Sequence, residues 1–116
     1  MLLKAIKKYA KYIYAFLLDN YKKGKYGGTG EKFNWNFIEI MKKFNKPYFV
    51  AGGLNPENIG ELLIKYKPYG IDISSGVEEK PGKKSPEKIK NLFKNIKYEN
   101  NNFCYYMDWY FLFHTC

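Results

Sequence analysis

The sequence predicts an α/β fold in which parallel strands alternate with helices. Three short segments, at residues 14–19, 48–51 and 71–77, are predicted to be strands, and the first two are continuous apolar runs of the kind that are buried on both faces of a sheet. The segments around them carry apolar residues at three- and four-residue steps, which places those side chains on one face of a helix. This alternation indicates parallel strands joined by helical crossovers.

The first third of the chain is predicted to form a helix, a strand and a loop. Helical spacing covers residues 2–13, and the apolar run at residues 14–19 ends on its only charged side chain, Asp19. Residues 20–35 are rich in glycine and irregular, which predicts a long loop. Loops of this length inside a compact domain are usually functional.

The middle of the chain is predicted to continue with a helix, a strand and another helix. Helical spacing at residues 36–44 ends before a proline, and residues 48–51 follow as the second strand. Asn55 is a candidate N-cap, and Pro56 suits the first position of a helix that we expect to reach about Lys65.

The third strand, at residues 71–77, ends in small side chains, and Ser85 with Pro86 then marks the start of a last helix. From residue 98 the composition changes abruptly to crowded aromatics without a clear period. We therefore divide the chain into a domain at residues 1–97 and an anomalous tail at residues 98–116, which we expect to be disordered or loosely packed. A partner-binding segment, a membrane-surface segment and an end created by a frameshift are the alternatives for the tail.

Composition and charge narrow the class of protein. At 116 residues, with 46% hydrophobic and 27% charged residues, the chain fits one folded domain. The formal charge of +9 comes from lysines spread along the chain without any arginine, so a nucleic-acid partner is not expected. The sequence also lacks the pattern of a signal peptide, and its cysteines, Cys104 and Cys116, fit neither a disulfide framework nor a metal site. We expect a cytoplasmic protein that does not bind membranes.

Small residues at the ends of two predicted strands are candidates for phosphate binding. Gly52 and Gly53 follow the second strand, and Ser75 and Gly76 lie at the end of the third. Backbone N–H groups in such loops can approach an anion, and two neighbouring loops can share one phosphate. A structural turn needs the same glycines, so the first loop alone is weak support.

Two carboxylates are the candidate acid–base and ligand-binding groups. Asp19 ends an apolar strand, where a partly desolvated carboxyl could serve as a general acid; a solvated cap of the following loop is the alternative. Asp72 lies inside the third strand, where we expect a polar partner. His114 is the only histidine, so a histidine-based triad or a multi-histidine metal site is not expected. Lys83 and Lys84 could steer a phosphorylated ligand, although loop lysines are usually just solvated.

The segments FLLD, YGGTG, FNW, AGGLNPEN, PYGIDISSGVE and PGKK occur in the order and approximate spacing of phosphoribosylanthranilate isomerases. The chain resembles this family from about residue 1 to residue 97. The resemblance implies a C-terminal fragment of a TIM (β/α)8 barrel, with the last three strands and their helices. It also implies an isomerase of tryptophan biosynthesis, part of aromatic amino acid biosynthesis, which converts an aminoaldose phosphate to an aminoketose phosphate by an Amadori rearrangement and uses no cofactor or metal.

The same resemblance implies roles for the candidate residues. Asp19 matches the family's general acid, which protonates the ribose ring oxygen, and Asp72 matches a ligand-contacting aspartate. Gly52, Gly53, Ser75 and Gly76 match the phosphate-binding loops. The family's general base, a cysteine on the first barrel strand, and its arginine near the anthranilate ring have no counterpart here. We therefore expect the chain to be inactive alone.

A barrel of eight strands closes into a ring, which three strands cannot do. The expected partners are accordingly a phosphosugar substrate and either a complementary N-terminal half or further copies of the chain. A non-catalytic phosphate-binding relic and an interaction module that uses the tail are the alternative functions.

Overall fold

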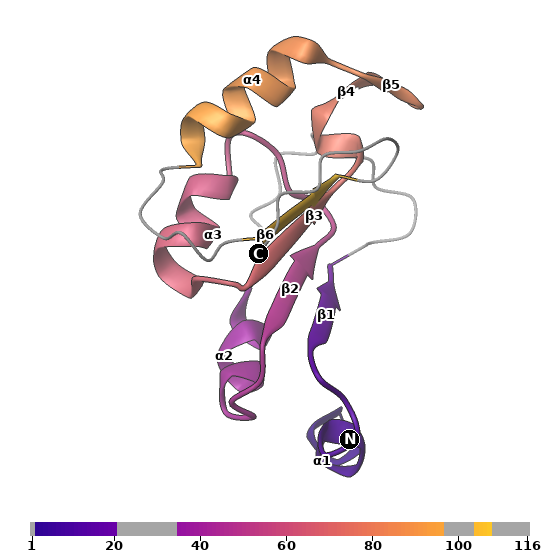
Figure 1. The fold of residues 1–116 in the computed structure, drawn as a ribbon, viewed down its shortest axis with the longest axis vertical. Coiled ribbons are helices and arrows are strands. Elements are labelled where there is room, and N and C mark those ends of the chain that lie inside the picture. The colour runs from indigo at the N-terminus through magenta and orange to yellow at the C-terminus, as the bar shows by residue number, and fades with distance from the viewer. Residues whose placement is uncertain (1, 21–34, 97–103, 108–116) are drawn as a thin grey trace.

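The predicted strands are neighbours in one parallel sheet. The computed structural model describes residues 2–20, 35–96 and 104–107, and its larger sheet has the strand order β1-β2-β3-β6 (Figure 1). Each neighbouring pair in this sheet is parallel, so the predicted α/β class is confirmed. The strands are β1 (Phe16–Asp19), β2 (Tyr48–Ala51), β3 (Gly70–Ile73) and β6 (Cys104–Met107).

Helices precede β1, connect the first three strands and follow β3, as predicted. They are α1 (Leu2–Ala10), α2 (Asn36–Lys42), α3 (Ile59–Tyr66) and α4 (Pro86–Asn95). The predicted cap of α4 is confirmed, because the Ser85 hydroxyl accepts a hydrogen bond from Lys88 N–H at 3.2 Å and Pro86 takes the first turn. Asn55 caps the turn before α3 as predicted, because its Oδ1 accepts from Glu57 N–H and Asn58 N–H, but α3 itself begins three residues later than predicted, with Asn58 at its N-cap.

The core lies between the sheet and the helices α2, α3 and α4. Val50, Ile71 and Ile73 are almost fully buried on the helix-facing side of the sheet, and apolar side chains from all three helices pack against them. The principal helix residues in this cluster are Ile38, Ile59, Leu62 and Leu92. Burial of each such side chain stabilises the fold by about 1.5–3 kcal/mol, which is why the helical spacing of the sequence predicts the buried face well.

The third strand is shorter than predicted. It ends at Ile73, where Ser74 turns the backbone out of the extended conformation (φ −121°, ψ −85°), and Ser75–Val77 form the short 3-10 helix η1. An antiparallel hairpin of β4 (Glu78–Lys80) and β5 (Lys83–Lys84) then leads to α4. Its strands are too short to show a period in the sequence.

Part of the predicted tail forms a strand. Cys104–Met107 pair with β3 in parallel, with Asp72 opposite Tyr106, so the backbone of β3 is hydrogen-bonded on both sides. No strand was predicted there, and the division of the chain at residue 97 stays a prediction. Most of the predicted glycine loop at residues 20–35, and most of the tail at residues 98–116 with His114 and Cys116, lie outside the described residues. No helix in the described part of the chain is long and apolar enough to cross a membrane.

Candidate functional site

All the predicted site residues lie at or just beyond the carboxyl ends of β1, β2 and β3. The register places Asp19 opposite Ala51 and Ala51 opposite Asp72, so the three residues form one row across the sheet. In-register residues of parallel strands point to the same face, and here it is the face away from the buried Val50 and Ile71. With neighbouring strands about 4.8 Å apart, the two aspartate backbones are about 10 Å apart. The two carboxyl groups therefore flank one strand end.

The two aspartates have different surroundings. Asp72 is half-buried, in agreement with a carboxylate inside a strand. Its neighbours in the sequence, Ile71 and Ile73, lie in the core. Asp19 is exposed at the last position of β1. The predicted partial desolvation of Asp19 is thus wrong for the chain in this structure, because the strand that holds it lies at the edge of the sheet.

The loop after β2 depends on its glycines. Gly52 and Gly53 have φ angles of 82° and 72°, a region that glycine adopts at least cost. Asn58 then holds the loop, since its amide donates to the Gly53 carbonyl at 2.9 Å and its Oδ1 accepts from Asn55 N–H at 2.9 Å. Because α3 begins only at Ile59, the donors available to an anion at this loop are the backbone N–H groups of the loop itself.

Gly76 brings the two predicted phosphate-binding loops into contact. A Cβ atom at this position would lie 1.7 Å from the Leu54 carbonyl oxygen and 2.8 Å from its carbon, so only glycine lets the backbones approach this closely. Gly52 and Gly53 immediately precede Leu54, while Ser75 precedes Gly76. The four residues predicted to bind phosphate therefore lie on two loops that contact each other through Gly76 and Leu54.

Lys84 contacts the candidate site, and the sequence did not distinguish it from its neighbour Lys83. Its ammonium group donates to the Ser74 carbonyl at 3.1 Å and to Glu78 Oε1 at 3.0 Å, and its side chain is 23% exposed. The hydrogen bond from Lys84 and the one from Gly82 N–H hold the pKa of Glu78 below its ordinary value. Lys84 thereby links the hairpin to the loop after β3. The preceding residue, Lys83, forms an ion pair on the surface instead.

Among the described residues, no three His, Cys, Asp or Glu side chains gather as metal ligands would. The described geometry offers backbone donors and a pair of carboxyl groups on one edge of a parallel sheet. This is where open parallel sheets and barrels of the α/β class bind their ligands.

Comparison with known proteins identifies the family. The family model described as N-(5'phosphoribosyl)anthranilate (PRA) isomerase matches residues 3–95. The chain belongs to this family, and the resemblance seen in the sequence is confirmed.

Relatives and solved structures agree with this assignment. The N-(5'-phosphoribosyl)anthranilate isomerase of Aquifex aeolicus is 46% identical over 86 residues, which are 74% of this chain and 42% of that protein. A crystal structure of the Thermus thermophilus isomerase matches with a TM-score of 0.61 and 37% identity, over 76% of this chain and 42% of that one. Another isomerase structure, in complex with reduced 1-(o-carboxyphenylamino)-1-deoxyribulose 5-phosphate, matches with a TM-score of 0.58 and 31% identity, over 79% of this chain and 42% of that one. This chain thus spans about two fifths of the relatives it matches.

Proposed function

We propose that this chain supplies the phosphate-binding and general-acid part of an N-(5'-phosphoribosyl)anthranilate isomerase site, and that turnover requires a complementary segment with the remaining strands. The observation that carries the proposal is the row formed by Asp19, Ala51 and Asp72, beside two loops that contact each other. The assignment of this chain to the C-terminal part of the family is part of the proposal.

The two loops would bind the phosphate of the substrate. Backbone N–H groups need no deprotonation or rotamer change to bind an anion, so loops held by Gly76 and by the Asn58 hydrogen bonds are preorganised for it. Lys84 would act as a positioning residue, because it binds the Ser74 carbonyl directly before Ser75. In this arrangement Gly52, Gly53, Ser75 and Gly76 surround the phosphate.

Asp19 would act as the general acid. When the phosphate is bound by the loops, the ribose extends toward the row of strand ends, where Asp19 can donate a proton to the ring oxygen as the C1–O bond breaks. The nitrogen lone pair forms the C=N bond of a Schiff base, and removal of the C2 proton by a base then leads to the aminoketose. Asp72, on the same face, would accept a hydrogen bond from a substrate hydroxyl.

The edge of the sheet supports the need for a complementary segment. β1 is the first strand in the sheet order. Leu17 on that strand is 62% exposed, and the nearby Tyr14 is 84% exposed. An edge strand with exposed apolar side chains offers its backbone to another strand. A segment that pairs there would cover Asp19 and could carry the missing base. A second copy of the chain is the other candidate partner; the isomerase of Thermotoga maritima is described as dimeric.

The test is turnover of enzymatically generated N-(5'-phosphoribosyl)anthranilate, measured for the full chain alone and for the chain mixed with an N-terminal segment of a related isomerase. We expect activity only in the mixture, and a decrease of about 10²–10⁴-fold for Asp19→Asn. Glu87→Gln, which removes an exposed carboxylate on α4, is the matched control and should leave activity unchanged. Equal activity of Asp19→Asn and the parent chain would refute the assignment of the acid.

Phosphate binding without turnover is the second candidate function. The two loops come together entirely from described residues of this chain, whereas the general base of the family has no counterpart in it. Saturable phosphosugar binding by the soluble chain, with no activity in any mixture, would favour this reading. A cytoplasmic place in tryptophan biosynthesis belongs to the first proposal only.

A further inference from the structure

A hollow lies on the molecule away from the candidate site. It has a volume of about 510 Å³ and is lined by residues at the ends of α2 and α3 and at the start of β2. Tyr48 lines it at the first position of β2, whereas Gly52 follows the last position, about 13 Å further along at the rise of a strand. The hollow is thus separate from the phosphate-binding loops. Its lining includes Lys42, Lys46, Tyr48, Lys65, Tyr66 and Lys67.

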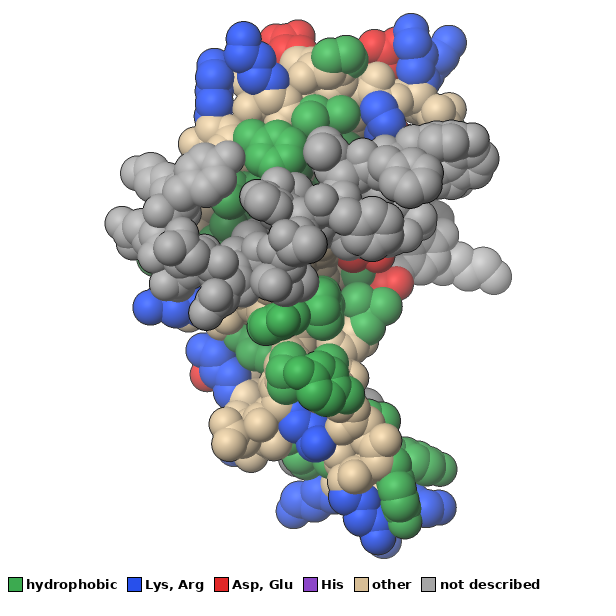
Figure 2. Space-filling view, in the orientation of Figure 1, with side chains coloured by type: hydrophobic (Ala, Val, Ile, Leu, Met, Phe, Trp, Pro, Cys, Tyr) green, Lys and Arg blue, Asp and Glu red, His purple; other side chains and the backbone are tan. Residues whose placement is uncertain are grey.

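The lining is strongly basic. Four lysines contribute to it, and Lys42 and Lys65 lie with their ammonium groups 5.4 Å and 5.2 Å from the centre of the Tyr66 ring. Figure 2 shows lysine side chains on this side of the molecule. The carboxylate that approaches them among the described residues is Glu39, 3.7 Å from Lys42. The ends of α2 and α3 each add about half a negative charge. These groups offset only part of the lysine charge, so about two positive charges remain.

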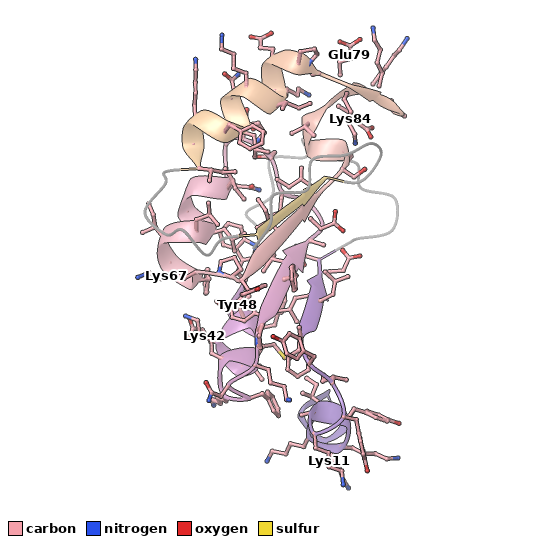
Figure 3. All side chains as sticks on the ribbon, viewed as in Figure 1. Lys11, Lys42, Tyr48, Lys67, Glu79 and Lys84 are labelled. Carbon is pink, nitrogen blue, oxygen red and sulfur yellow. The ribbon has the colours of Figure 1, made fainter. Side chains whose placement is uncertain are left out.

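Lys67 follows α3 with an unusual backbone conformation. It lies in the left-handed conformation (φ 47°, ψ 56°), where glycine is the residue that helix ends prefer. Lysine therefore adopts here a left-handed backbone conformation that residues with a Cβ atom disfavour. Figure 3 shows Lys67 and Lys42 on the same side of the molecule, with Tyr48 further inward near the start of β2.

The walls of the hollow are held in place by hydrogen bonds. The buried Tyr48 hydroxyl donates to the Tyr66 carbonyl, which joins the start of β2 to the end of α3. Lys46 Nζ donates to the Ile13 carbonyl at 2.7 Å, which joins this lysine to the segment before β1. α2 connects β1 to β2, and α3 connects β2 to β3, so the hollow between these helices is not at the outer edge of β1. A segment that pairs with that edge would leave the hollow open.

We propose that this hollow binds a small organic phosphomonoester. A phosphomonoester carries close to two negative charges at neutral pH, which matches the net charge of the lining. The volume lies in the range of small-molecule sites and leaves room for an organic group against the partly exposed Pro47 in addition to the phosphate. The ammonium groups of Lys65 and Lys67 bind the phosphate, and Lys42 completes the basic rim. This site is independent of the proposed isomerase function.

The probe is adenosine 5'-monophosphate, titrated into the full chain by calorimetry, with adenosine and inorganic phosphate as the comparison ligands. The test variant combines Lys65→Gln with Lys67→Gly, and Lys90→Gln, an exposed lysine on α4, is the matched control. Glycine at position 67 suits the left-handed backbone, so the thermal midpoint of the test variant should not fall because of that change. Loss of binding cannot then be ascribed to unfolding.

We expect the probe to bind the parent chain saturably, more tightly than adenosine or phosphate, and about tenfold or more weakly to the double variant, with no change in Lys90→Gln. Binding should also weaken with added salt. The proposal is overturned if the parent chain shows no saturable binding in the millimolar range, if adenosine binds as tightly as the phosphorylated probe, or if the double variant binds like the parent. Binding that survives in the double variant but is lost in Gly76→Ala would belong to the loops of the candidate site.

Discussion

Replacement of Gly76 by alanine is the most direct test of how the two loops are joined. The added methyl carbon would lie 1.7 Å from the Leu54 carbonyl oxygen and 3.1 Å from Asn55 Cα. Both neighbours are backbone atoms, so rotation of a side chain cannot relieve the overlap and one loop must move. Overpacking costs about 1–3 kcal/mol, and a clash between backbones belongs at the upper end of this range. We expect a loss of about 3 kcal/mol, a large share of the stability of a small domain.

The assay is urea unfolding followed by circular dichroism, with thermal unfolding beside it. A loss of about 3 kcal/mol corresponds to a fall of about 10–20 °C in the unfolding midpoint for a domain of this size. Gly60→Ala is the matched control: its methyl group would lie 3.7 Å from the Asn95 carbonyl, an ordinary contact, within helix α3. Alanine there should raise stability by about 0.5–1 kcal/mol. If Gly76→Ala unfolds within about 0.5 kcal/mol of the parent chain, the proposed close contact between the loops is wrong.

Three further predictions concern single side chains. Lys84→Met should destabilise the chain by about 1.5–3 kcal/mol. It should also remove the part of the stability that depends on the ionised Glu78 carboxylate. Because the pKa of Glu78 is lowered on folding, that part is present above its ordinary value of 4.5 and is lost as the pH falls below it; unfolding measured from pH 7 to pH 3 will show this. Ser85→Ala should cost about 1 kcal/mol by removing the cap of α4, as measured by urea unfolding. Tyr48→Phe should cost about 1–2 kcal/mol by removing the hydrogen bond to Tyr66.

Each of these predictions has an outcome that would contradict it. If the stability of Lys84→Met falls between pH 7 and pH 3 as much as that of the parent chain, the pKa of Glu78 does not depend on that lysine. A Ser85→Ala chain as stable as Ser85→Thr, which keeps a hydroxyl at the cap, would remove the cap as a source of stability. Burial raises the pKa of Tyr48 to about 12, so stability linked to it is present below pH 10 and lost between pH 10 and pH 12. If the parent and Tyr48→Phe chains lose stability equally over that range, Tyr48 is not the responsible group.

The elements that the sequence predicted well are those whose pattern follows from burial. The four-residue run at Tyr48–Ala51 was predicted with its observed bounds, because the strand lies inside the sheet and is covered along its length. The start of α4 was predicted from Ser85 and Pro86, since capping is a local interaction. β1 is two residues shorter than predicted. It lies at the edge of the sheet, where apolar residues such as Tyr14 stay exposed and the run no longer marks the strand.

Contacts between segments far apart in the sequence were not predictable in the same way. Nothing in the order of residues shows that Lys84 binds the Ser74 carbonyl while Lys83 stays on the surface, because that difference depends on how the hairpin folds back. The pairing of Cys104–Met107 with β3 was also missed, since the crowded aromatics of that segment have no period and its partner lies more than thirty residues earlier. The basic hollow combines residues of α2 and α3 that the sequence shows only as scattered lysines.

The sequence by itself determined the α/β class, the order of the four helices and the first three strands, and the family, because burial periodicity, capping and short motifs are local properties. Tertiary structure decided how these parts meet. The parallel register aligns Asp19 with Asp72 across Ala51, and the missing side chain of Gly76 lets one loop touch the carbonyl of Leu54. Such contacts depend on distances between strands and on the space between backbones, which are set only when the sheet and its helices pack together.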